Sequence, residues 1–185
     1  MRLVIEHLEP KLSQWLYIEY SHSARIAGDL LITNVRRASE RRRLSRVASV
    51  ERKSVGEIFS QRGILLLDPL ARKVLSPDDL QGKSVILIGG ILGNDPPLGR
   101  TRELLARKLP RATRRHIGRH QFAIDGAVYV ARQVVAGRRV EEIPVQVGLE
   151  IPIEPGYSVI LPYAFPMVGG KPLISDDLID YLRSH

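Results

Sequence analysis

Gly89-Gly90-Ile91-Leu92-Gly93-Asn94-Asp95-Pro96-Pro97 is a glycine-rich segment that directly follows the apolar run 85–88. A continuous apolar run bounded by turn residues is typical of a central strand in a parallel sheet that is covered on both faces. Ligands of open α/β sheets bind at the carboxyl ends of such strands, and glycines let the backbone approach them closely. The spacing matches neither the dinucleotide fingerprint nor the phosphate loop. The segment therefore indicates a ligand-binding loop, with an ordinary strand-to-helix turn as the alternative.

Strand and helix patterns alternate on both sides of this loop. Strands are expected at 3–5, 30–32, 64–67 and 113–117, and two more near Val145 and Val159. Helices are expected at 12–27, 100–109 and 124–135, with a last one opened by Ser175-Asp176-Asp177 and a partly helical charged stretch at 36–53. The order predicts one α/β domain with a mostly parallel sheet.

Two other strand ends resemble the glycine segment in their turn residues. Leu67-Asp68-Pro69 ends one apolar run, and His116-Ile117-Gly118-Arg119 ends another. Each alone is more often an ordinary turn. Three such ends in one small sheet provide what a small-molecule pocket requires, and this favours a functional interpretation.

Composition limits the class of protein. The 185 residues carry 28 Lys+Arg against 20 Asp+Glu, a net charge of +8, and no cysteine. The charge favours a polyanionic partner such as RNA, and the lack of cysteine excludes disulfides and thiolate chemistry. No spacing of His, Asp and Glu suggests a metal site. No apolar run approaches the ~20 residues of a membrane span, and no signal segment is visible, so a soluble, cytoplasmic protein is expected.

Matching segments along most of the chain resemble one branch of the SPOUT-class S-adenosylmethionine-dependent methyltransferases. The most specific match is Gly89-Gly90-Ile91-Leu92-Gly93 with Asp95-Pro96-Pro97. Weaker matches are Ile5-Glu6-His7, Ser13, Trp15, Glu19-Tyr20-Ser21, Leu67-Asp68-Pro69, Arg100-Thr101, Glu103-Leu104, Ile117-Gly118, Gln121, Asp125, Ala127 and Gly170-Lys171-Pro172. The stretch 36–53 has no match.

The resemblance implies an α/β fold with a deep trefoil knot around residues 64–137. It implies a methyltransferase domain at 1–143, with 144–185 as an extension packed on the same domain, in a monomer or homodimer. S-adenosylmethionine is the implied methyl donor, leaving S-adenosylhomocysteine as product. The implied donor-binding residues are Leu67, Asp68, Pro69, Gly89, Gly90, Ile91, Leu92, Gly93, Ile117, Gly118, Gln121 and Phe122.

The methyl acceptor stays open between two classes. The branch has been predicted to methylate RNA, whereas a fungal relative methylates an arginine of a small-subunit ribosomal protein. The resemblance favours the arginine, with rRNA or tRNA as the alternative and a non-catalytic knotted RNA-binding module as a further one. Asn94 stands where an acidic residue is usual, and Ala123 and Gly126 replace hydroxyl residues beside Asp125.

Four carboxylates in matching segments are candidates for orienting an acceptor guanidinium by paired hydrogen bonds: Asp95, Glu6, Glu19 and Asp125. Asp95 ranks first because its loop should reach the pocket, and Glu6 second because it ends a strand. Asp125 fits a helix N-cap better than a catalytic role, and Glu19 has an ion pair with an arginine as its alternative. His7 could act as a base near neutral pH but is more often simply hydrogen-bonded.

Two arginine-rich clusters bear on which kind of partner the protein binds. The first holds Arg36, Arg37, Arg41, Arg42, Arg43, Arg46, Arg52 and Lys53, and the second Arg102, Arg107, Lys108, Arg111, Arg114, Arg115 and Arg119. A solvated charged face is the alternative to phosphate binding. The first cluster contains only two acids, so most of its positive charge is unpaired. We therefore expect this cluster to contact RNA, as on a ribosomal subunit.

Overall fold

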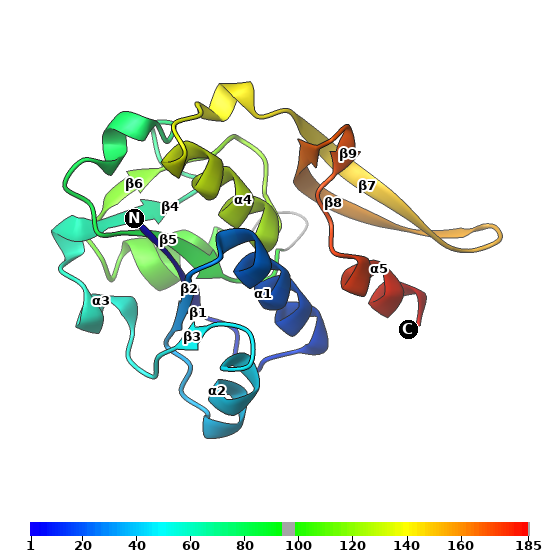
Figure 1. Ribbon diagram of the computed structural model, residues 1–185, viewed down its shortest axis with the longest axis horizontal. Coiled ribbons are helices and arrows are strands. Elements are labelled where there is room, and N and C mark those ends of the chain that lie inside the picture. Colours follow the sequence, from blue (N-terminus) through cyan, green and yellow to red (C-terminus); the bar gives the residue numbers. More distant parts are fainter. Residues whose placement is uncertain (94–98, 185) are drawn as a thin grey trace.

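The computed structural model describes residues 1–93 and 99–184, and it is an α/β protein built on a parallel sheet (Figure 1). The described strands of this sheet run in the order β3-β2-β1-β5-β4-β6, and every pairing is parallel. The strands are β1 (Arg2–His7), β2 (Leu30–Thr33), β3 (Ser49–Val50), β4 (Ile64–Leu67), β5 (Val85–Gly90) and β6 (Thr113–Arg115). The α/β prediction with a mostly parallel sheet is confirmed.

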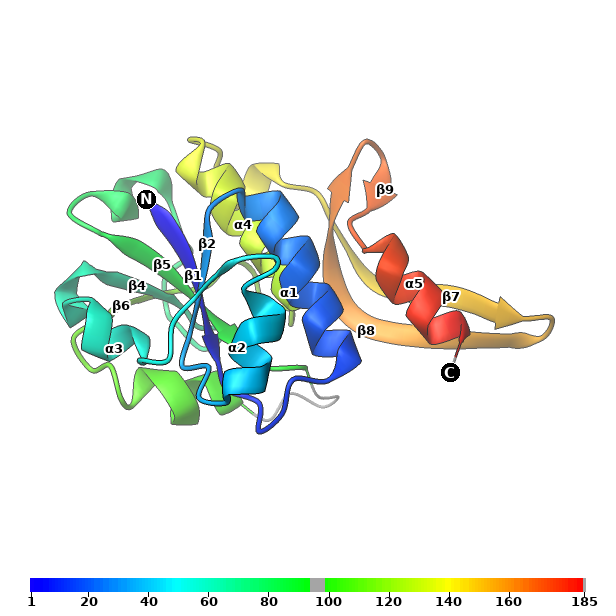
Figure 2. The same ribbon diagram turned by 60° about the horizontal axis from the view of Figure 1, so that its bottom comes forward.

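Helices cover both faces of the sheet because side chains alternate along its buried strands. Ile86 and Ile88 of β5 pack with α1 (Gln14–Ala27), α4 (Ile124–Val135) and α2 (Ala38–Leu44). Val85 and Leu87 face the opposite cluster, under α3 (Val55–Ile58) and the helical turn 102–109. Figure 2 shows α1 and α4 side by side on the first face.

Local sequence signals set the ends of α1. At its start the Ser13 hydroxyl accepts from the amide of the third helical residue, Leu16 N, at 3.1 Å. Gly28 ends it in the left-handed region at φ 77°, where glycine is favoured. The helix expected at 100–109 departs from α geometry, since Arg102–Ala106 forms a π-helical turn. None of the helices in the described part of the chain is long and apolar enough to cross a membrane.

The C-terminal residues form a second, antiparallel sheet of three strands. The two strands expected near Val145 and Val159 are long, β7 (Val145–Glu154) and β8 (Tyr157–Val168), and β9 (Lys171–Pro172) adds to β8. The hairpin β7–β8 projects from the body of the protein in both views (Figures 1 and 2). The last helix, α5 (Asp176–Arg183), packs against α1 and β7.

Adjacent glycines at the end of β5 differ in the room around them, and we expect them to respond differently to the same substitution. A Cβ on Gly90 would lie 2.1 Å from the Tyr20 hydroxyl and 2.7 Å from the Glu6 carbonyl oxygen of β1. A Cβ on Gly89 would meet nothing closer than 3.5 Å. Gly90→Ala should lower the free energy of unfolding by about 2 kcal/mol, as overpacking of a tight core does. Gly89→Ala, the matched control, should change it by less than ~0.5 kcal/mol. Urea unfolding of both variants measures this, and equal losses would contradict the packing.

Candidate active site

A cavity of about 540 Å³ opens at the carboxyl ends of β4, β5 and β6, which lie together because the strands are parallel. This volume lies in the range of small-molecule sites. The cavity wall is mostly apolar side chains and glycine backbone, with cations nearby. The lining residues are Leu67, Asp68, Pro69, Leu70, Ile88, Gly89, Ile91, Leu92, Gly93, Gly99, Arg100, Thr101, Arg102, Ile117, Gly118, Arg119, His120, Gln121, Phe122, Ile124 and Ala127.

All but one of the twelve residues implied as donor-binding line this cavity. The exception is Gly90. A side chain there would collide with the Tyr20 hydroxyl, so a glycine at this position accommodates Tyr20 and not a ligand. Ten other described residues line it without having been expected as donor-binding: Leu70, Ile88, Gly99, Arg100, Thr101, Arg102, Arg119, His120, Ile124 and Ala127. Ile88 could have been found as the last residue of its apolar run. Gly99 follows the segment 94–98 and carries no pattern that would distinguish it in the sequence, whereas Arg102 was grouped only with the second arginine-rich cluster.

Glu9 holds the glycine loop in place from the neighbouring loop after β1. Its carboxylate accepts from Leu92 N at 3.0 Å and from the Arg100 guanidinium at 2.8 Å. Arg100 also donates to the Leu92 carbonyl oxygen at 2.6 Å. The three residues join both ends of the loop to the chain after β1, so the cavity wall is braced by side chains as well as by the sheet.

Asp68 has a structural task although it lies at the cavity. Its side chain is fully buried, and its Oδ1 accepts from Leu70 N at 2.9 Å, which forms the turn after β4. Its Oδ2 lies 3.4 Å from the Arg114 guanidinium. Asp68 therefore shapes the loop whose backbone forms one wall.

Glu6 lies away from the cavity. It is buried at the end of β1, where it accepts from Val55 N at 2.9 Å and from the Thr33 hydroxyl. These bonds fasten the start of α3 to the sheet. Glu6 is absent from the cavity wall among the described residues.

Glu19 and Asp125 are buried side by side behind the cavity, between α1 and α4. Glu19 accepts from Trp15 Nε1 at 2.6 Å and from Ile124 N at 3.0 Å. Burial, and next the charge of Asp125, raise the pKa of Glu19 to about 8, although the bonds from Trp15 and Ile124 oppose the shift. No arginine pairs with Glu19 within 1–93 and 99–184, so the ion-pair alternative is not found there.

The N-cap prediction for Asp125 is wrong. Ala123 is the cap of α4, and Asp125 is the second residue of the helix. Its carboxylate accepts from Gly126 N at 2.7 Å and lies 2.7 Å from Nδ1 of His22 on α1. The first amide of α4, Ile124 N, is capped by Glu19 from another helix. Sequence spacing could not show this cap because it is made between elements far apart in the chain.

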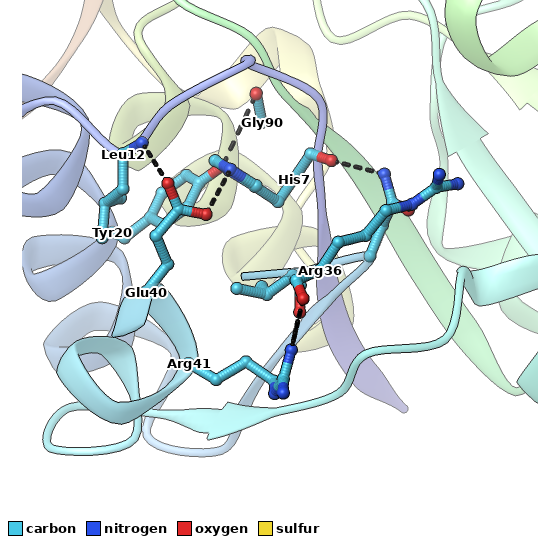
Figure 3. A network of polar contacts seen from close by, with 9 residues as sticks. His7, Leu12, Tyr20, Arg36, Glu40, Arg41 and Gly90 are labelled. Carbon is cyan, nitrogen blue, oxygen red and sulfur yellow. Dashed lines mark hydrogen bonds and ion pairs between the residues drawn. The ribbon is translucent and has the colours of Figure 1, made fainter. Parts of the chain in front are cut away.

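His7 lies in a buried polar network below the glycine loop (Figure 3). Its Nδ1 is 3.1 Å from the Tyr20 hydroxyl, and its Nε2 is 3.9 Å from Glu40. Burial lowers the pKa of His7 below its ordinary value, against the charges of Glu40 and Glu9. Glu40 also accepts from Leu12 N at 3.0 Å. His7 is 4% exposed and does not line the cavity, so its contacts join β1, α1 and α2.

Asp95, the first-ranked carboxylate, lies outside the described residues, as do Asn94, Pro96 and Pro97. The segment that holds them runs from Gly93 to Gly99, and both of these glycines line the cavity. Of the four candidate carboxylates, the three that the structure describes are therefore all absent from the cavity wall. The role of Asp95 stays a prediction.

The two arginine-rich clusters differ in how their charge is compensated. In the second, Arg107, Arg114 and Arg115 form ion pairs with Glu103, Asp68 and Asp79, whereas Arg102, Lys108, Arg111 and Arg119 pair with no acid among the described residues. In the first, Arg41 donates to backbone carbonyls and Arg43 stacks on Tyr17 at 4.1 Å. Its exposed members that pair with no acid among the described residues are Arg36, Arg37, Arg42, Arg46, Arg52 and Lys53.

Comparison with known proteins gives a consistent result. A family model described as protein arginine N-methyltransferase SFM1-like matches residues 2–185. The protein arginine N-methyltransferase SFM1 of Saccharomyces cerevisiae is 25% identical over 201 residues, covering 99% of this chain and 94% of the yeast protein.

Solved structures share the fold, the two SFM1 complexes over nearly the whole chain. The yeast arginine methyltransferase SFM1 complexed with SAH has a TM-score of 0.89 at 25% identity, covering 98% of this chain and 94% of that one. Its complex with SAM has a TM-score of 0.88 at 25% identity, covering 99% and 90%. The dual-specific Trm10 of Thermococcus kodakaraensis shares the fold alone, with a TM-score of 0.59 at 19% identity over 77% of this chain and 96% of that one.

Proposed function

Because the chain belongs to the SFM1-like family of protein arginine N-methyltransferases, we propose that it transfers a methyl group from S-adenosylmethionine to an arginine of a small-subunit ribosomal protein. Its α/β fold is that of the SPOUT-class methyltransferases. The observation that carries the proposal is the cavity at the ends of β4, β5 and β6, whose wall is made by the three loops that the sequence singled out.

The residues of the cavity fit the donor. Leu67, Ile88, Leu92 and Ile117 offer apolar walls for an adenine ring, and the cavity has the volume of a small-molecule site. Arg102 and Arg119 are exposed cations in the lining, suited to the carboxylate of the methionine part. When bound, S-adenosylmethionine supplies an electrophilic methyl group on a positively charged sulfur.

The chain's own contribution is to hold the acceptor in line with that methyl group, since positioning accounts for much of the acceleration in such a displacement. An arginine guanidinium is cationic and needs a carboxylate to orient it by paired hydrogen bonds and to accept the proton that is released. Asp95 is the proposed residue, because Glu6, Glu19 and Asp125 are held in structural bonds away from the cavity.

Replacing Asp95 should separate donor binding from turnover. We expect Asp95→Asn to lower kcat by at least ~100-fold, the range for loss of a group that transfers a proton. The affinity for S-adenosylhomocysteine, measured by calorimetry, should change by less than about threefold, which is under ~0.7 kcal/mol. Unchanged turnover would remove Asp95 from the proposed mechanism.

RNA is the second candidate acceptor, and the uncompensated first cluster favours it. Six exposed cations on and beside α2 and β3 suit phosphate contacts. The same cations would equally dock a protein methyltransferase on ribosomal RNA next to its target. A basic enzyme and a free basic protein repel each other, and RNA contact would offset that repulsion.

A labelling assay tests the proposed function. The protein is incubated with radioactive methyl donor and, separately, deproteinised RNA, extracted ribosomal protein and whole small subunits of the source organism. Label in a protein band, mapped to arginine, supports the proposal, and label in RNA alone overturns it in favour of RNA methylation. If calorimetry detects no binding of S-adenosylmethionine or S-adenosylhomocysteine, the non-catalytic alternative is favoured.

A further inference from the structure

The hairpin β7–β8 differs in charge from the rest of the protein. Residues 144–170 contain Glu150 and Glu154 and not one Lys, Arg or His, although the whole chain has 28 Lys+Arg. Helix α5, which packs on β7, adds the exposed acids Asp176, Asp177 and Asp180. Residues 144–184 therefore carry five acids against two cations, Lys171 and Arg183, on a strongly basic protein, and one of the acids, Asp177, pairs with Arg25.

The same hairpin exposes large apolar side chains. Ile160 is 71% exposed, Tyr157 61% and Val147 52%. Ile160 pairs across the strands with exposed Glu150, whereas the next pair, Leu149 and Leu161, turns to the buried side against α5. Exposed apolar side chains that are grouped together and rimmed by polar residues mark interaction sites.

The base of the hairpin is hydrogen-bonded to two residues that line the cavity. Tyr163 of β8 donates to the Gly93 carbonyl oxygen at 3.3 Å, and Ala164 N donates to the Gln121 carbonyl oxygen at 2.8 Å. Gly93 and Gln121 both line the cavity. Ile160 is three residues from Tyr163, about 10 Å along an extended strand. A partner bound to the hairpin therefore lies within reach of the cavity.

We propose that the outer surface of β7–β8 around Glu150 and Ile160 is the docking arm for the acceptor protein, which it binds through a basic segment next to the target arginine. This inference rests on the proposed arginine methylation. The arm supplies the acidic surface that a basic substrate needs on an enzyme of charge +8. RNA is disfavoured as its partner, because residues 144–170 carry two acids and no Lys or Arg to meet a phosphate, and the nearby Arg183 already donates to the Pro152 carbonyl oxygen.

A charge substitution on the arm tests the proposal by kinetics. The probe is total small-subunit ribosomal protein in the methyl-labelling assay, and the variant is Ile160→Lys. Ile58→Lys is the matched control, since Ile58 is 38% exposed on α3 at the opposite side of the sheet from α1. We expect Ile160→Lys to raise the apparent KM for the protein acceptor about tenfold, equal to ~1.4 kcal/mol. The control should stay within twofold, and both should bind S-adenosylhomocysteine as the unchanged protein does.

Cross-linking tests the contact independently of activity. The chain has no cysteine, so Ile160→Cys and Ile58→Cys can each carry one photo-reactive maleimide. An adduct with a ribosomal protein from Ile160→Cys but not from Ile58→Cys supports the arm. An adduct with a second copy of this chain or with RNA overturns it, as does an Ile160→Lys variant with unchanged KM.

The two proposals can fail separately. If no protein is labelled yet Ile160→Cys cross-links a ribosomal protein, the arginine methylation fails and the arm stands as a protein-binding surface. If a protein is labelled and neither hairpin variant responds, the arm alone fails.

Discussion

Gly93→Val should reduce the affinity for S-adenosylhomocysteine at least ~100-fold, a loss of ~2.7 kcal/mol. A Cβ at this position would lie 1.7 Å from Gln121 Nε2 and 2.4 Å from Cε1 of Tyr163. Gln121 itself lines the cavity, and the Tyr163 ring is held by its hydroxyl bond to Gly93. Either a side chain is displaced into the cavity or the loop moves, and both outcomes remove the donor site.

Calorimetry with S-adenosylhomocysteine measures the affinity, and thermal unfolding shows whether the fold survives. Gly56→Ala is the comparison, because Gly56 lies on α3 and is not among the residues that line the cavity. Combining Gly93→Ala with Gln121→Ala identifies the cause: if the collision matters, Gly93→Ala costs less affinity when the Gln121 amide is absent. Strictly additive losses in the double variant would contradict the collision.

Glu19 should make stability fall as the pH rises from about 5 to about 8. Its pKa in the folded protein is raised from 4.5 to about 8, so folding favours the protonated carboxyl. The stabilisation is fully present below pH 4.5, where the unfolded chain is protonated as well, and is lost as the pH rises through 8. A shift of this size corresponds to a loss of up to roughly 5 kcal/mol.

Urea unfolding of the protein and of Glu19→Gln between pH 5 and pH 9 measures this loss. Glu19→Gln cannot ionise, so we expect the difference in unfolding free energy between the two proteins to shift in favour of the variant as the pH rises. Asp125→Asn removes the neighbouring charge and should move the midpoint of the effect to lower pH. A difference that stays constant with pH would show that Glu19 is ionised throughout.

The parts of the fold predicted from the sequence were those set by local patterns. The runs 64–67 and 85–88 are buried strands because every residue in them packs on one face of the sheet or the other. Gly28 ends α1 where it was predicted, by chemistry that involves only neighbouring residues, whereas the predicted start at residue 12 was too early because Ser13 caps the helix before Gln14. The cavity followed from the rule that parallel strands bring their carboxyl ends to one edge.

What could not be predicted depends on contacts between distant segments. Glu19 caps a helix more than 100 residues away, and Glu9 braces a loop through Leu92 and Arg100. Nothing in the spacing of these residues connects them. The candidate carboxylates were ranked by the segments that they belong to, and only the folded chain shows that Glu6 and Asp125 already have partners.

The position of β1 at the centre of the sheet has a consequence for synthesis of the chain. One edge of β1 pairs with β2 soon after it, but its other edge pairs with β5, and Leu3 lies opposite Ile86. At 5–20 residues per second, the ribosome needs roughly 4 to 17 seconds to produce that partner. During this interval an apolar strand edge stays open to pairing with other nascent chains. We therefore expect newly made chains to need protection by chaperones until β5 has been synthesised.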